Sequence, residues 1–179
     1  MHFFNYFYTK TLKLDLINKF YYTDLKKLPN LKQIILNFSC KTIELKALAT
    51  HLLALELITH QKGIITVSKH PNILLKIRKG NPTGCKITLR RISMMEFLSK
   101  NLNEIFPKTK NFRGIKVHKK IEKTAFSFSV NNVLAFPELA KHYYLFTNLS
   151  NLNISFVTNG RTKKEMLFLL KSLQLPLKP

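Results

Sequence analysis

Residues 80–91 read GNPTGCKITLRR, a glycine- and proline-containing turn followed by an alternating stretch. The turn spans residues 80–84, and alternation over residues 85–91 predicts a β-strand. The apolar residues on one face of that strand are Cys85, Ile87 and Leu89. The polar residues on the other face are Lys86, Thr88 and Arg90. We therefore expect a strand with one buried face and one basic, polar face of the kind that binds RNA.

The same alternation occurs upstream in residues 31–39, LKQIILNFS. Ile34, Leu36 and Phe38 fall on one face, so Asn37 points away from the core. Further strands are predicted at residues 64–68, 73–78, 126–130 and 152–156. Helices are predicted at residues 11–22, 42–59 and 94–106, and a last one runs from the capping box Thr162–Glu165 to Leu173. Gly63 follows the second helix as its expected C-terminal cap.

These elements predict an α+β fold, a largely antiparallel β-sheet with helices packed on one face. The opposite face or edge of the sheet is expected to be basic. A chain of 179 residues is typical of one domain, so we assign residues 1–179 to a single RNA-binding domain with residues 1–9 as a tail.

The charge balance indicates the partner. Lys and Arg number 30 against 9 Asp and Glu, which gives a net charge of +21. So many like charges repel one another, and a protein that carries them usually binds a polyanion that neutralises them. Nucleic acid is the favoured partner. An anionic membrane surface is the second reading, although the basic residues form no single polybasic block. A merely solubilising surface is the third.

Catalytic and metal-binding patterns are missing from the sequence. Residues 80–88 lack the spacing of a phosphate-binding loop and precede a strand instead of a helix. Cys40 and Cys85 fit neither a disulfide framework nor a zinc site, and the six histidines show no metal-ligand spacing. The acidic residues are scattered singly. We expect no enzyme activity, no metal, no cofactor and no membrane-spanning segment.

Asn37, Gln61 and Thr88 are uncharged, and the residues alone favour ordinary cap or turn hydrogen bonds for them. Three sequence blocks favour a binding role for these residues instead: LPNLKQIILN at 28–37, HQK at 60–62 and KIRKGNPTGCKITLR at 76–90. Their order and separation resemble ribosomal protein five of the large subunit, the 5S-rRNA-binding family. NFRG at 111–114 and FPE at 136–138 extend the resemblance to about residues 10–177. The segment 121–127 departs from the family pattern because it has no glycine.

The resemblance implies a structural, non-catalytic component of the large subunit that contacts 5S rRNA and large-subunit rRNA in the central protuberance. Asn37, Gln61 and Thr88 match positions that hydrogen-bond 5S rRNA in this family. The full set of implied RNA-binding residues is Lys32, Asn37, Gln61, Lys62, Lys86, Thr88, Arg90 and Arg113. The alternatives are another basic RNA-binding protein, an RNA-acting enzyme or a membrane-surface adaptor.

Residues 69–84 match a family loop that reaches toward the tRNA in the peptidyl site and lies near the bridge to the small subunit. The loop residues implied to contact tRNA are Lys69, His70, Lys76, Arg78 and Lys79. Neighbouring ribosomal proteins, including a small-subunit bridge protein, are further implied partners. From the residues themselves, we expect the tip of this segment to be exposed.

The amino-acid composition carries a bias that indicates the cellular compartment. Lys far outnumbers Arg, Trp is absent, and Asn, Ile, Phe, Leu and Tyr are abundant, as A/T-rich genes produce. No import signal is visible at the start of the sequence. We expect a mitochondrial ribosome, with a plastid or a bacterial cytoplasm as alternatives.

Overall fold

The computed structural model describes residues 3–40, 45–74, 76–109, 112–117 and 122–178. The chain divides into two compact units. Unit 1 comprises Met1–Ile34, Arg90–Phe128 and Ser155–Pro179, and unit 2 comprises Ile35–Leu89 and Ser129–Ile154. Residues 42–44 of the predicted second helix and Asn111 lie outside the described residues. The assignment of the whole chain to one domain stays a prediction.

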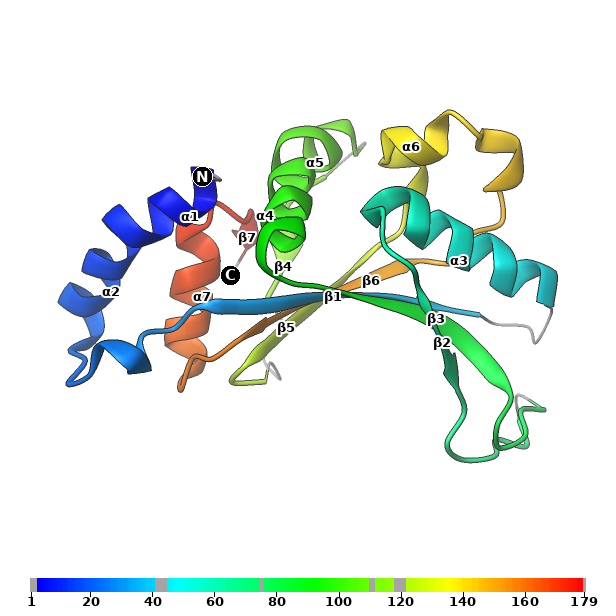
Figure 1. Ribbon diagram of the computed structural model, residues 1–179, viewed down its shortest axis with the longest axis horizontal. Helices are drawn as coiled ribbons and strands as arrows, with labels where there is room; N and C mark the ends of the chain where they lie inside the picture. The colour runs from blue at the N-terminus through cyan, green and yellow to red at the C-terminus, as the bar shows by residue number, and fades with distance from the viewer. Residues whose placement is uncertain (1–2, 41–44, 75, 110–111, 118–121, 179) are drawn as a thin grey trace. The chain divides into compact units, whose positions relative to one another are not determined.

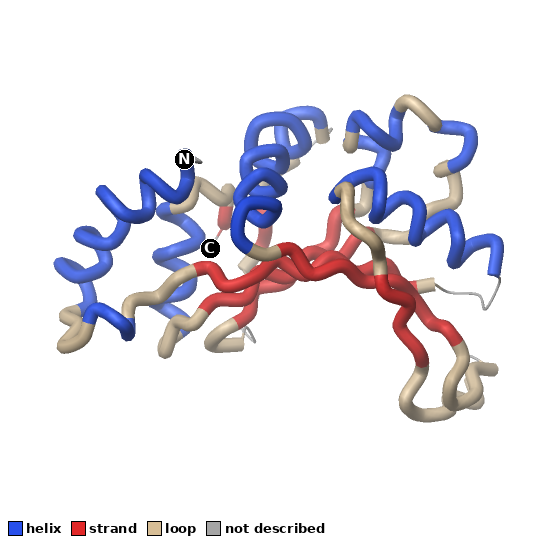
Figure 2. Tube along the Cα trace, viewed as in Figure 1, coloured by secondary structure: helices blue, strands red, loops and turns tan. Residues whose placement is uncertain are grey.

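A five-stranded sheet has the order β2-β3-β1-β6-β5. Its strands are β1 (Leu31–Ser39), β2 (Ile64–Val67), β3 (Pro82–Leu89), β5 (Ala125–Val130) and β6 (Leu152–Thr158). Figure 2 shows these strands in red, with the helices in blue. The predicted α+β class, with helices packed against a largely antiparallel sheet, is confirmed.

Unit 2 contains the antiparallel pair β2 and β3, with Ile64 opposite Lys86. Helix α3 (Leu45–Thr59) packs over β3, and the short helix α6 (Pro137–Ala140) packs against α3 (Figure 1). The buried His51 links α3 to the segment before β6: Ser150 donates its backbone N–H to Nε2 at 3.0 Å, and Nδ1 donates to the Ala47 carbonyl of the same helix. This histidine is a satisfied core residue.

Unit 1 is mainly helical. Its helices are α1 (Phe3–Phe7), α2 (Lys13–Phe20), α4 (Arg91–Lys100), α5 (Phe106–Lys108) and α7 (Lys163–Ser172). A π-helical turn (Tyr8–Leu12) joins α1 to α2, so part of the expected tail is helical. Leu12 and Leu16 are buried as their spacing predicts, and Phe20 packs edge-on against Phe168 of α7. A small parallel pair, β4 (Ile115–Lys116) and β7 (Leu177–Lys178), completes the unit.

The predicted capping box at the start of α7 is present in a modified form. Thr162 accepts a hydrogen bond from the Glu165 N–H at 3.2 Å. The Glu165 carboxylate accepts from the N–H of Arg161, one residue earlier than the usual box partner.

Two local predictions are wrong. The described residues of the segment 73–78 form no strand; an isolated bridge joins Asn72 to Ile77 around a tight turn. Gly63 is not the cap of α3, because His60 adopts the left-handed conformation (φ 54°) and donates its N–H to the Glu56 carbonyl at 2.8 Å. Gly63 instead allows close packing, since a Cβ there would lie 2.6 Å from the Leu52 side chain.

Candidate nucleic-acid interface

Strand β1 presents Asn37 on the side of unit 2 that faces away from α3. Leu36 and Phe38 are fully buried, and the Phe38 ring contacts the His51 ring of α3 with centroids 5.2 Å apart. Neighbouring side chains on a strand point to opposite faces. Asn37 is half-buried and therefore lies on the face opposite the helix.

Strand β3 pairs beside β1 and repeats this arrangement. The Cys85 thiol lies 3.7 Å from the Leu48 carbonyl of α3, which fixes the helix side of the strand. Lys86 and Thr88 consequently lie on the other face, where Lys86 is exposed and Thr88 is half-buried. Asn37, Lys86 and Thr88 are therefore side chains of one surface, which we call the sheet face.

Asn37 and Thr88 are not cap residues. Within the described part of the chain, neither side chain forms a hydrogen bond to another protein group. An amide and a hydroxyl held on rigid strands without internal partners are free to bond to a ligand. Gln61 differs, because it already interacts within the protein.

Gln61 and Lys62 connect α3 to β2. The antiparallel register pairs Ile64 with Lys86, and the Gly63 position packs on Ile87. Extending this register by two residues on each strand sets Lys62 opposite Thr88. Lys62 is exposed and Gln61 is half-buried, so both lie beside the end of the sheet face that Thr88 occupies.

The cations predicted at residues 32 and 90 belong to unit 1. Arg90 follows β3, and its Nε and Nη2 donate to Oε1 of Gln33 at 3.2 and 3.1 Å. The amide oxygen thereby fixes the direction of an exposed guanidinium. Lys32 is exposed at the start of β1, and the alternation of the strand places it on the face opposite Gln33. Sequence reasoning missed Gln33 as a site residue, because the alternation alone did not show that it positions Arg90.

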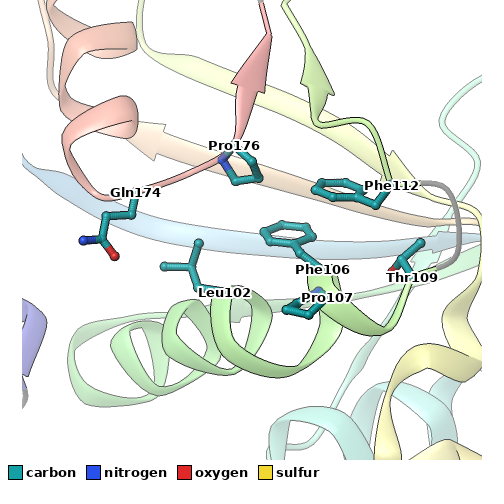
Figure 3. A pocket seen from close by; sticks show the side chains of 7 residues that line it. All are labelled: Leu102, Phe106, Pro107, Thr109, Phe112, Gln174 and Pro176. Carbon is teal, nitrogen blue, oxygen red and sulfur yellow. The ribbon is translucent and has the colours of Figure 1, made fainter.

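Arg113 lies on a different part of unit 1. It is exposed and follows Phe112, which stacks on Phe106 of α5 with ring centroids 4.8 Å apart (Figure 3). The two rings line a cavity of about 410 Å³, together with polar residues that include Thr109 and Gln174. Gly114 has φ +92°, and a Cβ there would lie 2.9 Å from the Pro176 carbonyl oxygen. The glycine therefore permits the 2.7 Å hydrogen bond from the Ile115 N–H to Pro176 that starts the β4–β7 pair.

Residues 68–81 connect β2 to β3, and we call them the basic hairpin. Ser68 donates its N–H to the Asn81 carbonyl at 2.9 Å, and Gly80 returns a bond to the Ser68 carbonyl at 3.0 Å. Five basic residues surround this hydrogen-bonded frame, and all five are exposed: Lys69, His70, Lys76, Arg78 and Lys79. The predicted exposure of the tip is confirmed.

The hairpin also exposes two aliphatic side chains. Ile73 is 92% exposed and Leu74 is 94% exposed. Such large apolar residues at a tip, surrounded by cations, are typical of an interaction site for a macromolecule. Neither was singled out as a site residue from the sequence.

The cysteines do not form a reactive site. Burial, with a smaller contribution from the neighbouring Cys40, raises the pKa of Cys85 to about 11, and burial also raises the pKa of Cys40. Both thiols are therefore protonated at neutral pH and are poor nucleophiles. In the described ranges, no three His, Cys, Asp or Glu residues cluster as a metal site. The helices described there include none that is long and apolar enough to cross a membrane.

Comparison with known proteins assigns this arrangement to a family. Residues 82–177 match the family model that describes the C-terminus of ribosomal L5 proteins. The chain belongs to the ribosomal L5 family. It is 37% identical over 172 residues to the large ribosomal subunit protein uL5m of Reclinomonas americana, covering 95% of this chain and 94% of that protein.

Bacterial relatives are also similar. The uL5 protein of Malacoplasma penetrans is 33% identical, with 94% of this chain and 90% of the relative covered. The uL5 protein of Nitrosomonas europaea is 30% identical, with 96% of each chain covered. The predictions of a large-subunit ribosomal protein and of a structural, non-enzymatic role are confirmed by this membership. As a ribosomal L5 protein, the chain associates with rRNA and other ribosomal proteins.

Proposed function

We propose that this ribosomal L5 protein binds 5S rRNA and large-subunit rRNA in the central protuberance. The observation that carries the proposal is the pair Asn37 and Thr88, two polar side chains without internal partners among the described residues, on the sheet face. The minor groove of an RNA helix is wide and shallow and displays 2′-hydroxyls and base edges. The open face of a sheet can approach such a groove.

The two side chains suit that surface chemically. The Asn37 amide offers donors and acceptors together, and the Thr88 hydroxyl offers one donor and two acceptors. A 2′-hydroxyl is itself a donor and an acceptor, so it can satisfy both groups. Gln61 contributes at the end of the face beside Lys62. These neutral groups supply the selectivity for one RNA surface.

The cations supply affinity in this proposal. Three lysines lie on or next to the sheet: Lys32, Lys62 and Lys86. None of these ammonium groups pairs with a carboxylate in the part of the chain that the structure describes. Arg90, directed by Gln33, and Arg113 are further phosphate ligands. Contacts to phosphates position a protein on RNA but carry no sequence information.

The test is the identity of the bound RNA. The full-length protein is tagged and isolated from its host after mild crosslinking, and its RNA is sequenced. We expect 5S rRNA and a defined segment of large-subunit rRNA to be enriched over other RNAs. An excess of small-subunit rRNA or messenger RNA would contradict the proposal.

The basic hairpin is proposed to contact the peptidyl-site tRNA and a bridge protein of the small subunit. Its five basic residues suit a phosphate backbone, and Ile73 and Leu74 suit a protein surface. Weak contacts from a projecting hairpin suit a ligand that must leave in every elongation cycle.

The proposed location is the mitochondrial ribosome. The composition bias of the sequence supports it, as does similarity to a relative named uL5m, although bacterial relatives are nearly as similar. Antibody detection in gradient fractions of ribosomes from purified organelles tests this. We expect the protein in the large-subunit fraction of mitochondria. Its presence in plastid or cytoplasmic ribosomes alone would contradict it.

A further inference from the structure

Unit 1 contains a second cavity, of about 500 Å³, and Lys32 is the only one of its lining residues that the proposed function already uses. Three separate segments of the chain form its walls. They are the first helical segment around Tyr8 and Lys13, the start of β1 around Lys32, and the first turn of α4 around Arg91. The cavity volume is within the range that holds small ligands.

The cavity combines charge with an apolar floor. Lys13, Lys32 and Arg91 line it, whereas no Asp or Glu among the described residues does. These three cations form no ion pair within the described ranges of the chain. The floor includes Met94 and Met95, which are 3% and 6% exposed. A matching ligand has a negatively charged group and a flat apolar part.

Two of the three walls are linked to each other within the protein. The Tyr8 hydroxyl donates to the Pro29 carbonyl at 2.9 Å, which ties the first helical segment to the residues before β1. Burial raises the pKa of Tyr8, so this hydroxyl stays protonated and keeps donating. The Lys13 ammonium lies over the Tyr8 ring, 5.8 Å from its centroid. Because these contacts already fix the cavity, ligand binding costs little conformational entropy of the protein.

We propose that this cavity holds one unpaired nucleotide of rRNA. Its phosphate lies among Lys13, Lys32 and Arg91, and its base lies against Met94 and Met95. An RNA duplex is too wide to enter such a space, whereas protein recognition of RNA commonly uses single bases turned out of the stack. Methionine side chains adapt to a flat surface of any base. The inference rests on the proposed binding of rRNA.

Photocrosslinking tests the position of the nucleotide. Ile92 lines the cavity and is 63% exposed, so a benzoylphenylalanine in its place would be near the ligand. In assembled ribosomes we expect one dominant crosslink, mapped by reverse transcription to a nucleotide that is unpaired. The matched control carries the same residue at Tyr144, which is 74% exposed in unit 2. Crosslinks of the Ile92 variant to protein, or to many RNA positions, would overturn the proposal.

Affinity measurements separate this site from general RNA binding. The double variant Lys13→Ala, Arg91→Ala is compared with Lys164→Ala, Lys171→Ala, which removes two exposed charges of α7 outside the cavity. For rRNA, we expect the cavity variant to bind at least tenfold more weakly. The slope of log affinity against log salt should fall by about one unit, as expected when one or two phosphate contacts are lost. Thermal unfolding checks that both variants fold.

The ways in which the proposal can fail are distinct. If the wild type prefers rRNA and both variants bind equally, the cavity proposal fails while the proposed function stands. If the wild type does not prefer rRNA over unrelated RNA, the proposed function fails. Saturable binding of free adenosine monophosphate, without a crosslink to rRNA, would assign the cavity to a small molecule and overturn the RNA assignment.

Discussion

The sheet face and the basic hairpin are adjacent parts of unit 2 with different chemistry. The sheet face places neutral polar groups, Asn37 and Thr88, on strands backed by α3. The basic hairpin carries five basic residues and two exposed aliphatic ones on a turn with a few backbone hydrogen bonds. The first arrangement is held by a core, and the second is held mainly by its own backbone.

This difference separates two functions: the sheet face suits selective binding of one RNA, and the basic hairpin suits reversible electrostatic attraction. Hydrogen bonds discriminate only when their donors and acceptors are held in place, which a buried core achieves. Charge attracts over several ångströms and tolerates imprecise placement. A strand surface therefore suits a permanent RNA partner, and a charged turn suits a transient one.

The largest loss of stability is expected from Gly84→Ala, which disturbs the packing of β3 against β1 beneath the sheet face. A Cβ on this residue of β3 would overlap the backbone carbonyl of Phe38 on β1, which cannot move as a side chain does. We expect a loss of about 3 kcal/mol in the free energy of unfolding, at the upper end for overpacking. Binding to 5S rRNA should be lost with it. Urea unfolding followed by circular dichroism measures the first, and filter binding the second.

The hairpin offers a matched control at Gly80. Its φ is +88°, but a Cβ there meets nothing within 4 Å. Gly80→Ala should cost only about 1 kcal/mol, the backbone penalty alone, and leave 5S rRNA binding intact. Equal losses for the two variants would show that the hairpin and the sheet face are not supported differently.

The next effect concerns Asn37→Ala and Thr88→Val, which remove polar groups but keep the fold. If each group bonds to RNA, its loss should cost about 1–3 kcal/mol for 5S rRNA and little for an unrelated RNA. The control is Thr50→Val on α3, where the hydroxyl donates to the Ala47 carbonyl at 2.8 Å. Equal weakening for both RNAs would assign Asn37 and Thr88 to structure instead of selectivity.

The sequence contains most of the information for the sheet face. Alternation alone placed Ile34, Leu36 and Phe38 inside and Asn37 outside, because a half-buried strand allows no other register. The same reasoning placed Lys86 and Thr88. It could not show that Arg90 is bonded to Gln33, because that contact joins residues 57 positions apart.

The hairpin was predicted less well, for a physical reason. Residues 73–78 contain Ile, Leu and Ile at spacings that fit a strand, and strand propensity is mainly a measure of burial against neighbours. Here Ile73 and Leu74 are almost fully exposed, and the left-handed Lys76 (φ 52°) closes a turn. The end of α3 at His60 was missed similarly, since a positive φ is uncommon in residues other than glycine and Gly63 was the nearest glycine.

A smaller effect is expected from reversing charge on the hairpin with Lys69→Glu and Lys79→Glu. Reconstituted large subunits should bind 5S rRNA normally but retain peptidyl-site tRNA roughly tenfold more weakly, because two phosphate attractions become repulsions. Lys46→Glu with Lys141→Glu repeats the same charge change on α3 and at the end of α6, outside the hairpin. Loss of 5S rRNA binding with normal tRNA retention would assign the hairpin to assembly.

The smallest effect is expected from a single cation on the sheet face, Lys86→Ala. Lys86 is exposed on β3 opposite Ile64, and in this proposal it contacts one phosphate beside the groups that select the RNA. Removing one phosphate contact lowers the slope of log affinity against log salt by about 0.9 for a duplex. Because a phosphate contact carries no sequence information, affinity should fall equally for 5S rRNA and unrelated RNA. Fluorescence anisotropy across a salt series measures both quantities, with Lys46→Ala as the control. A preference for 5S rRNA that falls with an unchanged slope would place Lys86 among the selective groups, and the division between neutral selectivity and charged attraction on this face would not hold.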